Sequence, residues 1–317
     1  SSLVTAVAST VSDQKINTFS IAIDEGKYDE SKYALAVARH LKTNHHEFNV
    51  QIKEVLEIVN DLLPTYDEPF GDSSSFPTMV LSRLAKQHVT VALSGDGGDE
   101  LFMGYGTHLW ANRMDHPIVR SLRWPLHMVS KIMSNRYQRA GEVFAYPVED
   151  RRISHIFSAE QYYFNENELK DISQMPFNFE TLNRTNLISR SCTKAEAQSI
   201  WDFNYYLGDE LLVKLDRASM RYSLETRVPL VDYRIVEFAY NLHQDLKMKN
   251  GTMKFIIKEV LYDYVPKNLF DRPKWGFTIP ISKWLKTDLA YLLDKYTAQN
   301  IIEKYNYVNY DNVEGLG

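Results

Sequence analysis

A short stretch of the chain, residues 91–106, joins an apolar run to a dense group of glycines and acids. It reads VALSGDGGDELFMGYG. Glycine lets a backbone approach a ligand closely, and carboxylates at such a point suit a metal ion or another positive charge. We therefore expect Asp96 and Asp99 to take part in chemistry there. The alternative interpretation is an ordinary glycine-rich turn in which an aspartate caps the following helix.

Two further polar features lie elsewhere in the chain. Asp72, Ser73 and Ser74 precede a helix that begins near Pro77, and polar loops of this kind often line the pocket of a substrate. Their alternative role is to cap that helix. Lys254 stands in the apolar run NGTMKFII. Taken by itself, this residue is most simply a solvated helix lysine.

The elements that must position these residues alternate between strand and helix over the first hundred positions. We predict strands at 17–23, 45–50 and 88–94, and helices at 29–42, 55–63 and 78–86. This order predicts an α/β fold with a parallel sheet and helices on both faces. Ligands bind at the carboxyl ends of such strands, which is where residues 94–100 lie.

Beyond about residue 107 the pattern becomes helical and rich in aromatic residues. We therefore expect one domain over 1–317. Its α/β part, 1–110, would carry the ligand site, and its helical part, 111–317, would pack on it.

Composition limits the class of protein. The chain has 317 residues, of which 44% are hydrophobic, and it has 36 Lys and Arg against 41 Asp and Glu. The single cysteine argues against a disulfide framework or a cysteine-based zinc site. No apolar run reaches the length of about 18 residues that spans a bilayer, and no block of basic residues suits nucleic acid. We expect a cytoplasmic protein without a nucleic-acid or membrane partner.

Several segments together resemble the glutamine-hydrolysing asparagine synthetase family, in its C-terminal ATP-pyrophosphatase synthetase domain. SGDGGDELFMGY is similar to the family's LSG(E/D)GxDE(L/V)FGGY motif. In order along the chain, further matches are TFSIAIDEGKYDESKYALAVARHLKTNHHEF, DEPFGDSSSFPTMVLSRLAK, KLDRASMRYSLETRVPLVD, NGTMKFIIKEVLYDYVP and RPKWGFTIPISKWL. The ordered set covers nearly the whole chain, which makes it far more specific than any one motif.

The resemblance implies an adenine nucleotide α-hydrolase-like fold and a carbon–nitrogen ligase that uses ATP and Mg²⁺. A small-molecule carboxylate, aspartate in the type case, attacks the α-phosphate of ATP. This forms an acyl-adenylate and releases pyrophosphate. Ammonia from a glutaminase domain then displaces AMP and gives the amide, which is asparagine for an aspartate substrate.

The resemblance also implies roles for individual residues. Asp99 would hold Mg²⁺ and pyrophosphate, and Lys254 would reach the phosphates or the intermediate. Asp96 stands where many members carry a glutamate that forms and turns over the acyl-adenylate. Its shorter side chain leaves open whether it transfers a proton directly. The residues expected to contact ATP or pyrophosphate are Ser1, Ser2, Ile21, Ser94, Gly95, Gly97 and Asp99. Those expected in the acceptor pocket are Asp72, Ser73, Ser74 and Arg217, although Arg217 could instead belong to an ion-paired brace behind the site.

Two family features are not found in residues 1–317. One is the glutaminase domain with its N-terminal cysteine nucleophile. The other is the first strand with most of the phosphate loop Ser-Gly-Gly-x-Asp-Ser, of which Ser1 and Ser2 resemble the tail. We therefore expect these 317 residues alone to be inactive. Whether the missing parts lie upstream is left open.

Two other functions compete with this one. An enzyme of the same family could amidate a different carboxylate, such as a surface-sugar or secondary-metabolite acceptor. A relative without catalysis could bind nucleotides as a scaffold, although Asp99 and Lys254 both being present argues against that. The sequence does not fix the acceptor or the oligomeric state, and a homodimer is compatible with it.

Overall fold

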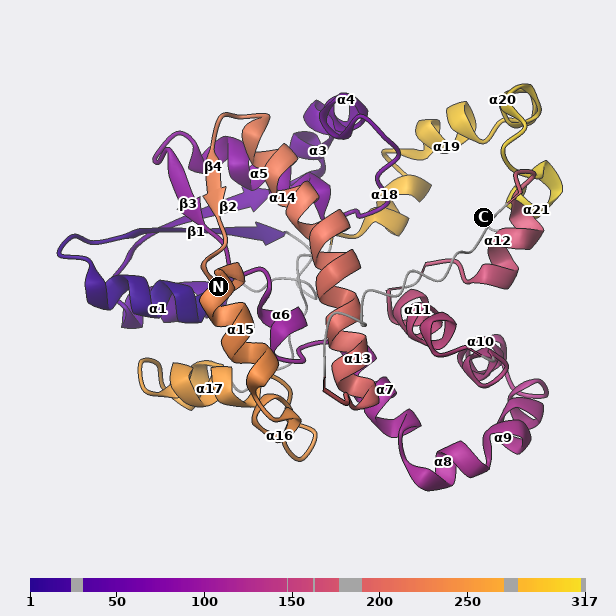
Figure 1. Ribbon diagram of the computed structural model, residues 1–317. Helices are drawn as coiled ribbons and strands as arrows, with labels where there is room; N and C mark the ends of the chain where they lie inside the picture. The colour runs from indigo at the N-terminus through magenta and orange to yellow at the C-terminus, as the bar shows by residue number, and fades with distance from the viewer. Residues whose placement is uncertain (24–30, 147, 162, 177–189, 271–278, 315–317) are drawn as a thin grey trace. The chain divides into compact units, whose positions relative to one another are not determined.

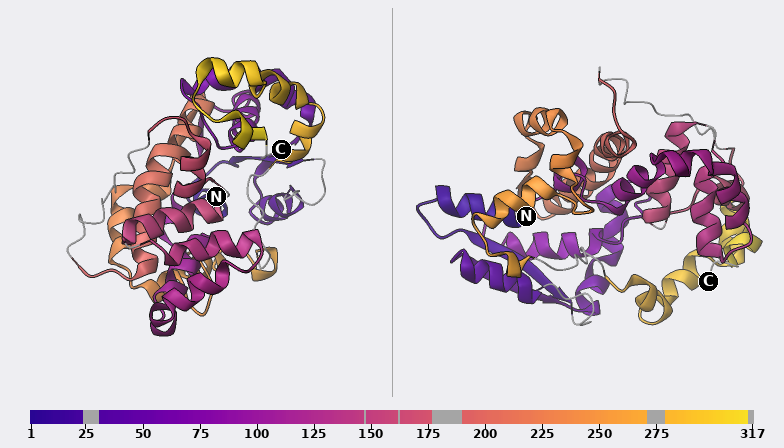
Figure 2. Two further views of the ribbon diagram at one scale, coloured as in Figure 1. Left: turned by 90° about the vertical axis from the view of Figure 1, so that its right-hand side faces the viewer. Right: turned by 90° about the horizontal axis from the view of Figure 1, so that it is seen from below.

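The computed structural model describes residues 1–317 except 24–30, 147, 162, 177–189, 271–278 and 315–317 (Figures 1 and 2). The chain forms two compact units. The first comprises Ser1–Phe102 and Tyr205–Asp288, and the second comprises Met103–Asn204 and Leu289–Gly317. This division differs from a sequential boundary at residue 110, because residues 205–288 return to the first unit and pack there on α5 and β3.

The first unit contains the parallel strand pairs. Its strands are β1 (Asn17–Ile23), β2 (Asn44–Val50), β3 (Val91–Leu93) and β4 (Glu225–Arg227). Its helices are α1 (Ser2–Val11), α2 (Ser31–His40), α3 (Ile52–Ile58), η1 (Val59–Asp61), α4 (Leu62–Tyr66), α5 (Ser75–Ala85), α6 (Gly98–Leu101), α14 (Leu212–Met220), η5 (Pro229–Val231), α15 (Tyr233–Asn241), α16 (Gln244–Lys247), α17 (Phe255–Tyr262), η6 (Lys267–Leu269) and α18 (Ile281–Lys286).

The strands pair in parallel, as the alternation of strand and helix predicts. β1 lies beside β2 in a register that runs from Asn17 opposite Asn44 to Ile23 opposite Val50 (Figure 1). β3 pairs with β4. Among the described residues these are two separate two-stranded sheets and not one continuous sheet. The α/β class is therefore correct, whereas the single sheet is not formed by the strands described.

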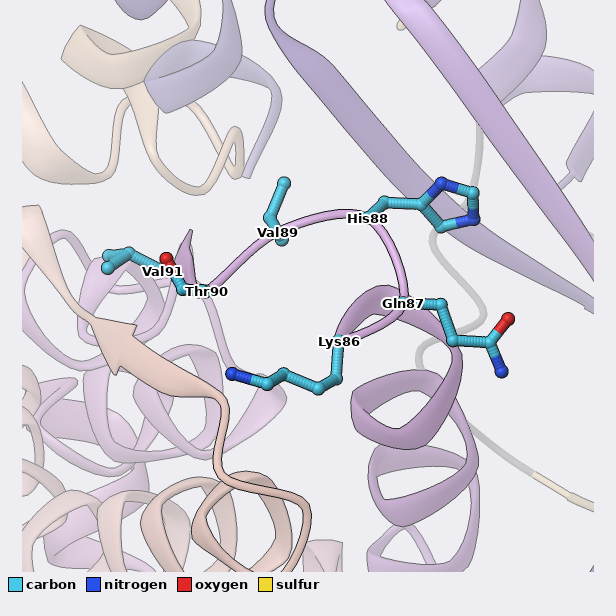
Figure 3. A pocket seen from close by; sticks show the side chains of 6 residues that line it. All are labelled: Lys86, Gln87, His88, Val89, Thr90 and Val91. Carbon is cyan, nitrogen blue, oxygen red and sulfur yellow. The ribbon is translucent and has the colours of Figure 1, made fainter.

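The connection from α5 to β3 separates the two sheets. Its residues Lys86–Val91 line an open pocket of about 550 Å³ (Figure 3). His88 projects from it toward β1 and β2, and its ring centroid lies 4.1 Å from that of His46 (Figure 3). The predicted strand 88–94 is reduced to Val91–Leu93, since its first residues form this connection.

The core of the first unit forms where amphipathic helices meet. Ala6 of α1, Val37 of α2, Leu261 of α17 and Val265, which follows that helix, form one buried cluster. Helices α2 and α5 also pack against both β1 and β2. Leu3 and Leu41 pack against this cluster, three residues from Ala6 and four from Val37, which is the spacing that places apolar side chains on one helix face.

The second unit is helical where it is described. Helix α13 packs against α7 and continues at Asp202 into a π-helix, η4 (Asp202–Leu211). The buried Asp202 carboxylate accepts hydrogen bonds from Thr107 at 3.1 Å and Gln198 at 2.9 Å, and it lies 3.0 Å from Nε2 of His108. The helices are α7 (Gly106–Met114), α8 (Pro117–Ser121), α9 (Arg123–Ser130), α10 (Asn135–Gly141), η2 (Glu142–Phe144), α11 (Glu149–Glu160), α12 (Glu166–Ile172), α13 (Lys194–Trp201), α19 (Ala290–Tyr296), α20 (Gln299–Tyr305) and α21 (Tyr310–Glu314). No helix in the described parts of either unit is long and apolar enough to cross a membrane.

An ion-paired brace joins the loop before α5 to α14. The Lys214 ammonium donates to Asp72 Oδ2 at 2.6 Å and to Ser74 Oγ at 2.7 Å. Ser74 donates to Asp72 from its backbone N–H and from its hydroxyl, each at 2.8 Å. Burial raises the pKa of Asp72, but the Lys214 charge and the hydrogen bonds from Lys214 and Ser74 outweigh it, so the pKa lies below its usual value.

This brace predicts a pH-dependent loss of stability for Asp72→Asn. A carboxyl whose pKa is lowered by folding stabilises the fold above its unfolded pKa of about 4, and this contribution is lost as the pH falls further. The variant leaves the Lys214 ammonium, 12% exposed, without its counter-charge. We expect its free energy of unfolding at pH 7 to fall by about 2–4 kcal/mol. Urea unfolding between pH 3 and 7 should show the difference from the parent shrinking below about pH 4.

Asp67→Asn is the matched control, because Asp67 also pairs with an α14 cation, Arg217, but is 80% exposed. Its cost should stay within about 1 kcal/mol. Two results would contradict a stabilising role for the brace. One is an equal loss of unfolding free energy in the two variants, and the other is a stability difference between Asp72→Asn and the parent that does not change with pH.

The turn from β3 into α6 requires glycine at position 97. Gly97 has φ +83°, and a Cβ there would lie 2.6 Å from Cγ2 of Val231. Gly97→Ala therefore combines left-handed strain with a collision, and we expect it to lower the free energy of unfolding by at least about 2 kcal/mol. Gly251→Ala isolates the strain, since Gly251 has φ +78° and no neighbour within 4 Å, and it should cost about 1 kcal/mol.

Gly71→Ala introduces neither effect, because a Cβ at Gly71 meets nothing within 4 Å and its φ is not positive. In thermal and urea unfolding, the loss of stability should be largest for Gly97→Ala, smaller for Gly251→Ala and smallest for Gly71→Ala. If Gly97→Ala is no less stable than Gly251→Ala, Val231 does not restrict the turn.

Candidate active site

The loop after β3 begins as an extension of the β3–β4 pairing. The backbone N–H of Ser94 donates to the carbonyl of Arg227 at 2.8 Å. The Ser94 hydroxyl donates to Oδ2 of Asp96, so the Asp96 carboxylate is folded back onto the end of the strand. Both residues were predicted from the sequence. The partner strand that fixes Ser94 was not, since the three residues of β4 carry too weak a pattern to be recognised.

The two glycines that follow turn the chain into the short helix α6. Gly97 is the N-cap residue, and Asp99 and Glu100 stand in the first turn. Leu230 and Val231 of η5 close behind the glycines, with Leu230 Cδ1 3.0 Å from where a Cβ of Gly98 would be. The absence of side chains thus allows η5 to pack directly against the turn that carries Asp99.

Lys254 reaches this turn from a distant part of the sequence. Its Nζ lies 2.7 Å from Oδ1 of Asp99, with side chains 24% and 14% exposed respectively. The sequence pattern around Lys254 predicts a position inside a helix. Lys254 is instead the N-cap residue of α17, with φ +55°. The structure therefore brings together the two charged residues that the sequence places in different motifs. A role for Lys254 at the phosphates stays a prediction.

Ser1 lies against the same loop. A Cβ on Gly95 would lie 2.1 Å from the backbone nitrogen of Ser1 and 2.5 Å from its Cα. Only glycine allows this approach. Ser1 is also the N-cap residue of α1, which begins at Ser2. Helix N-termini attract anions in general, and a contact of Ser1, Ser2 and this loop with phosphate stays a prediction.

Ile21 occupies a different place from these residues. It lies in the middle of β1, opposite Phe48 of β2, and it is 9% exposed. Ser94 extends the β3–β4 sheet, whereas Ile21 belongs to the β1–β2 sheet. A contact between its backbone and adenine stays a prediction.

The residues predicted for an acceptor pocket are held in contacts with one another and with α14. Asp72 and Ser74 belong to the brace with Lys214, and the carbonyl of Ser73 accepts from the N–H of Phe76 at 3.4 Å. Arg217 donates to Oδ2 of Asp67 at 2.9 Å and to the carbonyl of Tyr66. These contacts favour the brace interpretation for Arg217. A role in binding the acceptor stays a prediction for all four.

The 550 Å³ pocket does not coincide with the predicted site. Its lining residues, Lys86–Val91, precede or begin β3, whereas Ser94–Asp99 follow it. Ligands of α/β proteins bind at the carboxyl ends of the strands. We therefore place the candidate site at the Ser94–Asp99 loop.

The donor set fits Mg²⁺ that arrives with phosphate. Asp99 offers a carboxylate, the hard oxygen ligand that Mg²⁺ prefers. Within the described residues, no three or more His, Cys, Asp or Glu side chains are grouped to hold a metal ion. An ion that takes its other ligands from phosphate and water suits such a site better than one that needs a full protein cage.

Comparisons with known proteins agree with these motifs. The family model for asparagine synthase matches residues 1–316. A Methanocaldococcus jannaschii protein named putative asparagine synthetase (glutamine-hydrolyzing) 2 is 37% identical over 225 residues, which are 69% of this chain and 43% of the relative. The Bacillus subtilis protein named asparagine synthetase (glutamine-hydrolyzing) 1 is 26% identical over 307 residues, 93% of this chain and 47% of the relative.

A Mycobacterium bovis protein named putative asparagine synthetase (glutamine-hydrolyzing) is 28% identical over 287 residues, 86% of this chain and 42% of the relative. The chain thus spans less than half the length of each of these three curated relatives. The match of the family model from Ser1 to residue 316, together with the ordered motifs around Asp99 and Lys254, shows that this chain belongs to the asparagine synthase family.

Proposed function

We propose that this chain carries the synthetase site of an ATP-dependent carbon–nitrogen ligase that converts aspartate to asparagine. The observation that carries the proposal is the 2.7 Å pair between Lys254 and Asp99, beside a glycine-rich loop at the end of a parallel strand. A cation and a carboxylate at such a loop suit a reaction whose charge develops on phosphate. Membership of the family, and the names of the relatives, support the same reaction.

The reaction proceeds by activation and then substitution. The substrate carboxylate attacks the α-phosphate of ATP, and the bond to the β-phosphate breaks, which gives an acyl-adenylate and pyrophosphate. Ammonia then attacks the acyl carbon, and AMP leaves. The first step concentrates negative charge on the departing pyrophosphate, so its rate depends on donors and cations that are fixed before the reaction begins.

The chain's own residues suit that step. The Lys254 ammonium, held beside the loop by Asp99, donates to oxygens of the departing phosphates. The backbone of Ser94, Gly95 and Gly97 forms this loop, and Ser1, the N-cap residue of α1, lies against Gly95. Asp96, fixed by Ser94, takes the place of the family's glutamate beside the acyl-adenylate. Mg²⁺, when it is bound with ATP near Asp99, supplies further positive charge to the pyrophosphate.

The proposal also covers the source of nitrogen, the fold of the α/β part and the location in the cell. The relatives' names describe glutamine hydrolysis, and we propose that a glutaminase domain supplies ammonia to this site. We also propose the adenine nucleotide α-hydrolase-like fold for the α/β part, and a cytoplasmic location. The alternative acceptor, a carboxylate other than aspartate, differs only in the pocket and not in the Lys254–Asp99 chemistry.

The first test measures AMP and pyrophosphate release with ATP, Mg²⁺ and a panel of carboxylates in the protein that contains these residues. Ammonium is supplied so that the result does not depend on glutamine. Aspartate should give the highest kcat/KM, and Asp99→Asn should lower it at least about 10²-fold because a group that organises the charge at the pyrophosphate is lost. Asp13→Asn, the same change on an exposed carboxylate, should have no effect.

Release of AMP with another carboxylate but not with aspartate would show that the acceptor is that carboxylate, while the proposed activation by ATP would stand. ATP binding without AMP release from any carboxylate would establish the scaffold function instead. Full activity of Asp99→Asn would show that Asp99 does not take part in the reaction.

The second test separates transition-state from ground-state binding at Lys254. Because the charge on the departing phosphates is largest in the transition state, Lys254→Ala should lower kcat by about 10²-fold or more, with little change in the KM for ATP. Lys258→Ala, one turn further along α17, is the control and should retain the parent values. An increase in KM alone would make Lys254 a ground-state ligand, and unchanged kinetics would leave it a structural partner of Asp99.

A further inference from the structure

One segment of the second unit has an unusual charge pattern. Residues 116–141, which form α8, α9 and α10, contain five Lys and Arg and no Asp or Glu. The chain as a whole has 36 Lys and Arg against 41 Asp and Glu, so the remaining residues carry 31 basic and 41 acidic side chains. The basic segment therefore stands out from an otherwise acidic protein. The three helices follow one another along one edge of the second unit (Figure 1).

Helix α9 directs its polar side inward. Arg123, His127 and Ser130 are spaced by four and three residues, which places them on one helix face. The Arg123 guanidinium donates to the carbonyls of Phe144 and Tyr146. The ring of the buried His127 lies against the Gly141 carbonyl, with Nδ1 at 3.2 Å, and the Ser130 side chain packs over Gly141 itself. This polar face attaches α9 to α10 and η2.

The opposite side of the same helices is apolar and faces solvent. Trp124 is 68% exposed, Met128 is 59% exposed and Ile132 is 85% exposed. Trp124 and Met128 are four residues apart on α9, which places them on one helix face, and Ile132 lies in the turn that follows this helix. We refer to these three exposed side chains as the stripe. Further exposed apolar side chains of the same segment are Ile118, Leu122, Val129, Met133 and Tyr137. In a globular domain the apolar face of a helix normally points to the core, and here the arrangement is reversed.

Basic side chains occur in the same segment as this stripe. Arg120, Lys131 and Arg136 are exposed, and none of them forms an ion pair with another residue that the structure describes. The other two cations of the segment have structural partners, since Arg123 binds backbone carbonyls and Arg139 lies 3.4 Å from Glu168. The surface of α8–α10 therefore combines exposed Trp, Ile and Met with three cations available to an external anion.

We propose that the α8–α10 surface binds the headgroup region of an anionic lipid bilayer. Basic residues beside a stripe that contains Trp and large aliphatic side chains are the pattern of helices that lie in the membrane interface. Such binding requires no helix that spans the bilayer. The expectation of no membrane partner rests on the lack of an apolar run long enough to span a bilayer, and a surface of short helices gives no such run.

The charge and the apolar side chains of this surface favour an anionic bilayer over a second copy of the chain or a nucleic acid. In a symmetric contact between two copies, the same surface would face itself, so Arg120, Lys131 and Arg136 would meet like charges. Nucleic acid would satisfy the cations but leave Trp124 and Ile132 in water. An anionic bilayer satisfies both kinds of side chain, and the acidic remainder of the protein is repelled from it, which orients the α8–α10 surface toward the lipid.

The test measures flotation of the full chain with vesicles of phosphatidylcholine containing 30% phosphatidylglycerol, and with vesicles of phosphatidylcholine alone. The protein should bind the anionic vesicles only, with an affinity that falls as salt increases. Arg120→Glu/Lys131→Glu/Arg136→Glu should weaken binding by at least about 100-fold, since each basic residue near an anionic surface contributes about tenfold or somewhat less. Trp124→Ser/Ile132→Ser should weaken it at least about tenfold.

Lys15→Glu/Lys32→Glu/Lys53→Glu is the matched control for charge. It alters three exposed lysines of the first unit by the same total charge and should retain binding. All the changed side chains are exposed, and unchanged thermal unfolding of each variant establishes that its fold is intact. A blue shift of tryptophan emission on binding should decrease in Trp124→Phe, because that residue enters the interface.

Three results would overturn the proposal. The first is the absence of binding to anionic vesicles at low salt. The second is binding that Trp124→Ser/Ile132→Ser leaves unchanged, since the surface would then hold the bilayer by charge alone. The third is a dimer in sedimentation equilibrium that the same double variant dissociates, because the stripe would then be an interface between two copies.

Discussion

The parallel pairing of β3 with β4 is the contact on which the candidate site depends. It is only three residues long, yet it brings Arg227 to the end of β3, where its carbonyl receives the Ser94 N–H. The chain after β4 then forms η5, which closes behind Gly97 and Gly98. A strand from the second half of the sequence thus fixes the direction in which the Ser94–Asp99 loop leaves the sheet.

The return of residues 205–288 also explains why the charged side chains meet. α14 carries Lys214 to the loop before α5, and the start of α17 carries Lys254 to Asp99. In both cases a cation from the second half of the chain meets a carboxylate from the first. The site is therefore assembled by long-range packing, and the local sequence around each residue supplies only the chemical group.

This division accounts for what the sequence could predict. The strand at 17–23 was found with its bounds, and the strand at 45–50 within one residue, because their apolar patterns are local. The Asp96 and Asp99 loop was recognised from its glycines, and the partners Ser1 and Lys254 from their place in the family motifs. The two separate sheets, the strand β4 and the N-cap position of Lys254 were not predictable. They depend on pairings that no window of local sequence contains.

Position 254 has to meet two requirements, a left-handed backbone conformation and a cation beside Asp99. Its φ of +55° lies in the left-handed region, where glycine and asparagine are favoured and a long side chain costs free energy. The position nevertheless holds a lysine, whose ammonium contacts Asp99. Selection for stability alone would replace Lys254 by glycine or asparagine and remove the cation. Position 254 is therefore a point of conflict between folding and charge placement, where substitutions chosen for thermostability would be expected to act against activity.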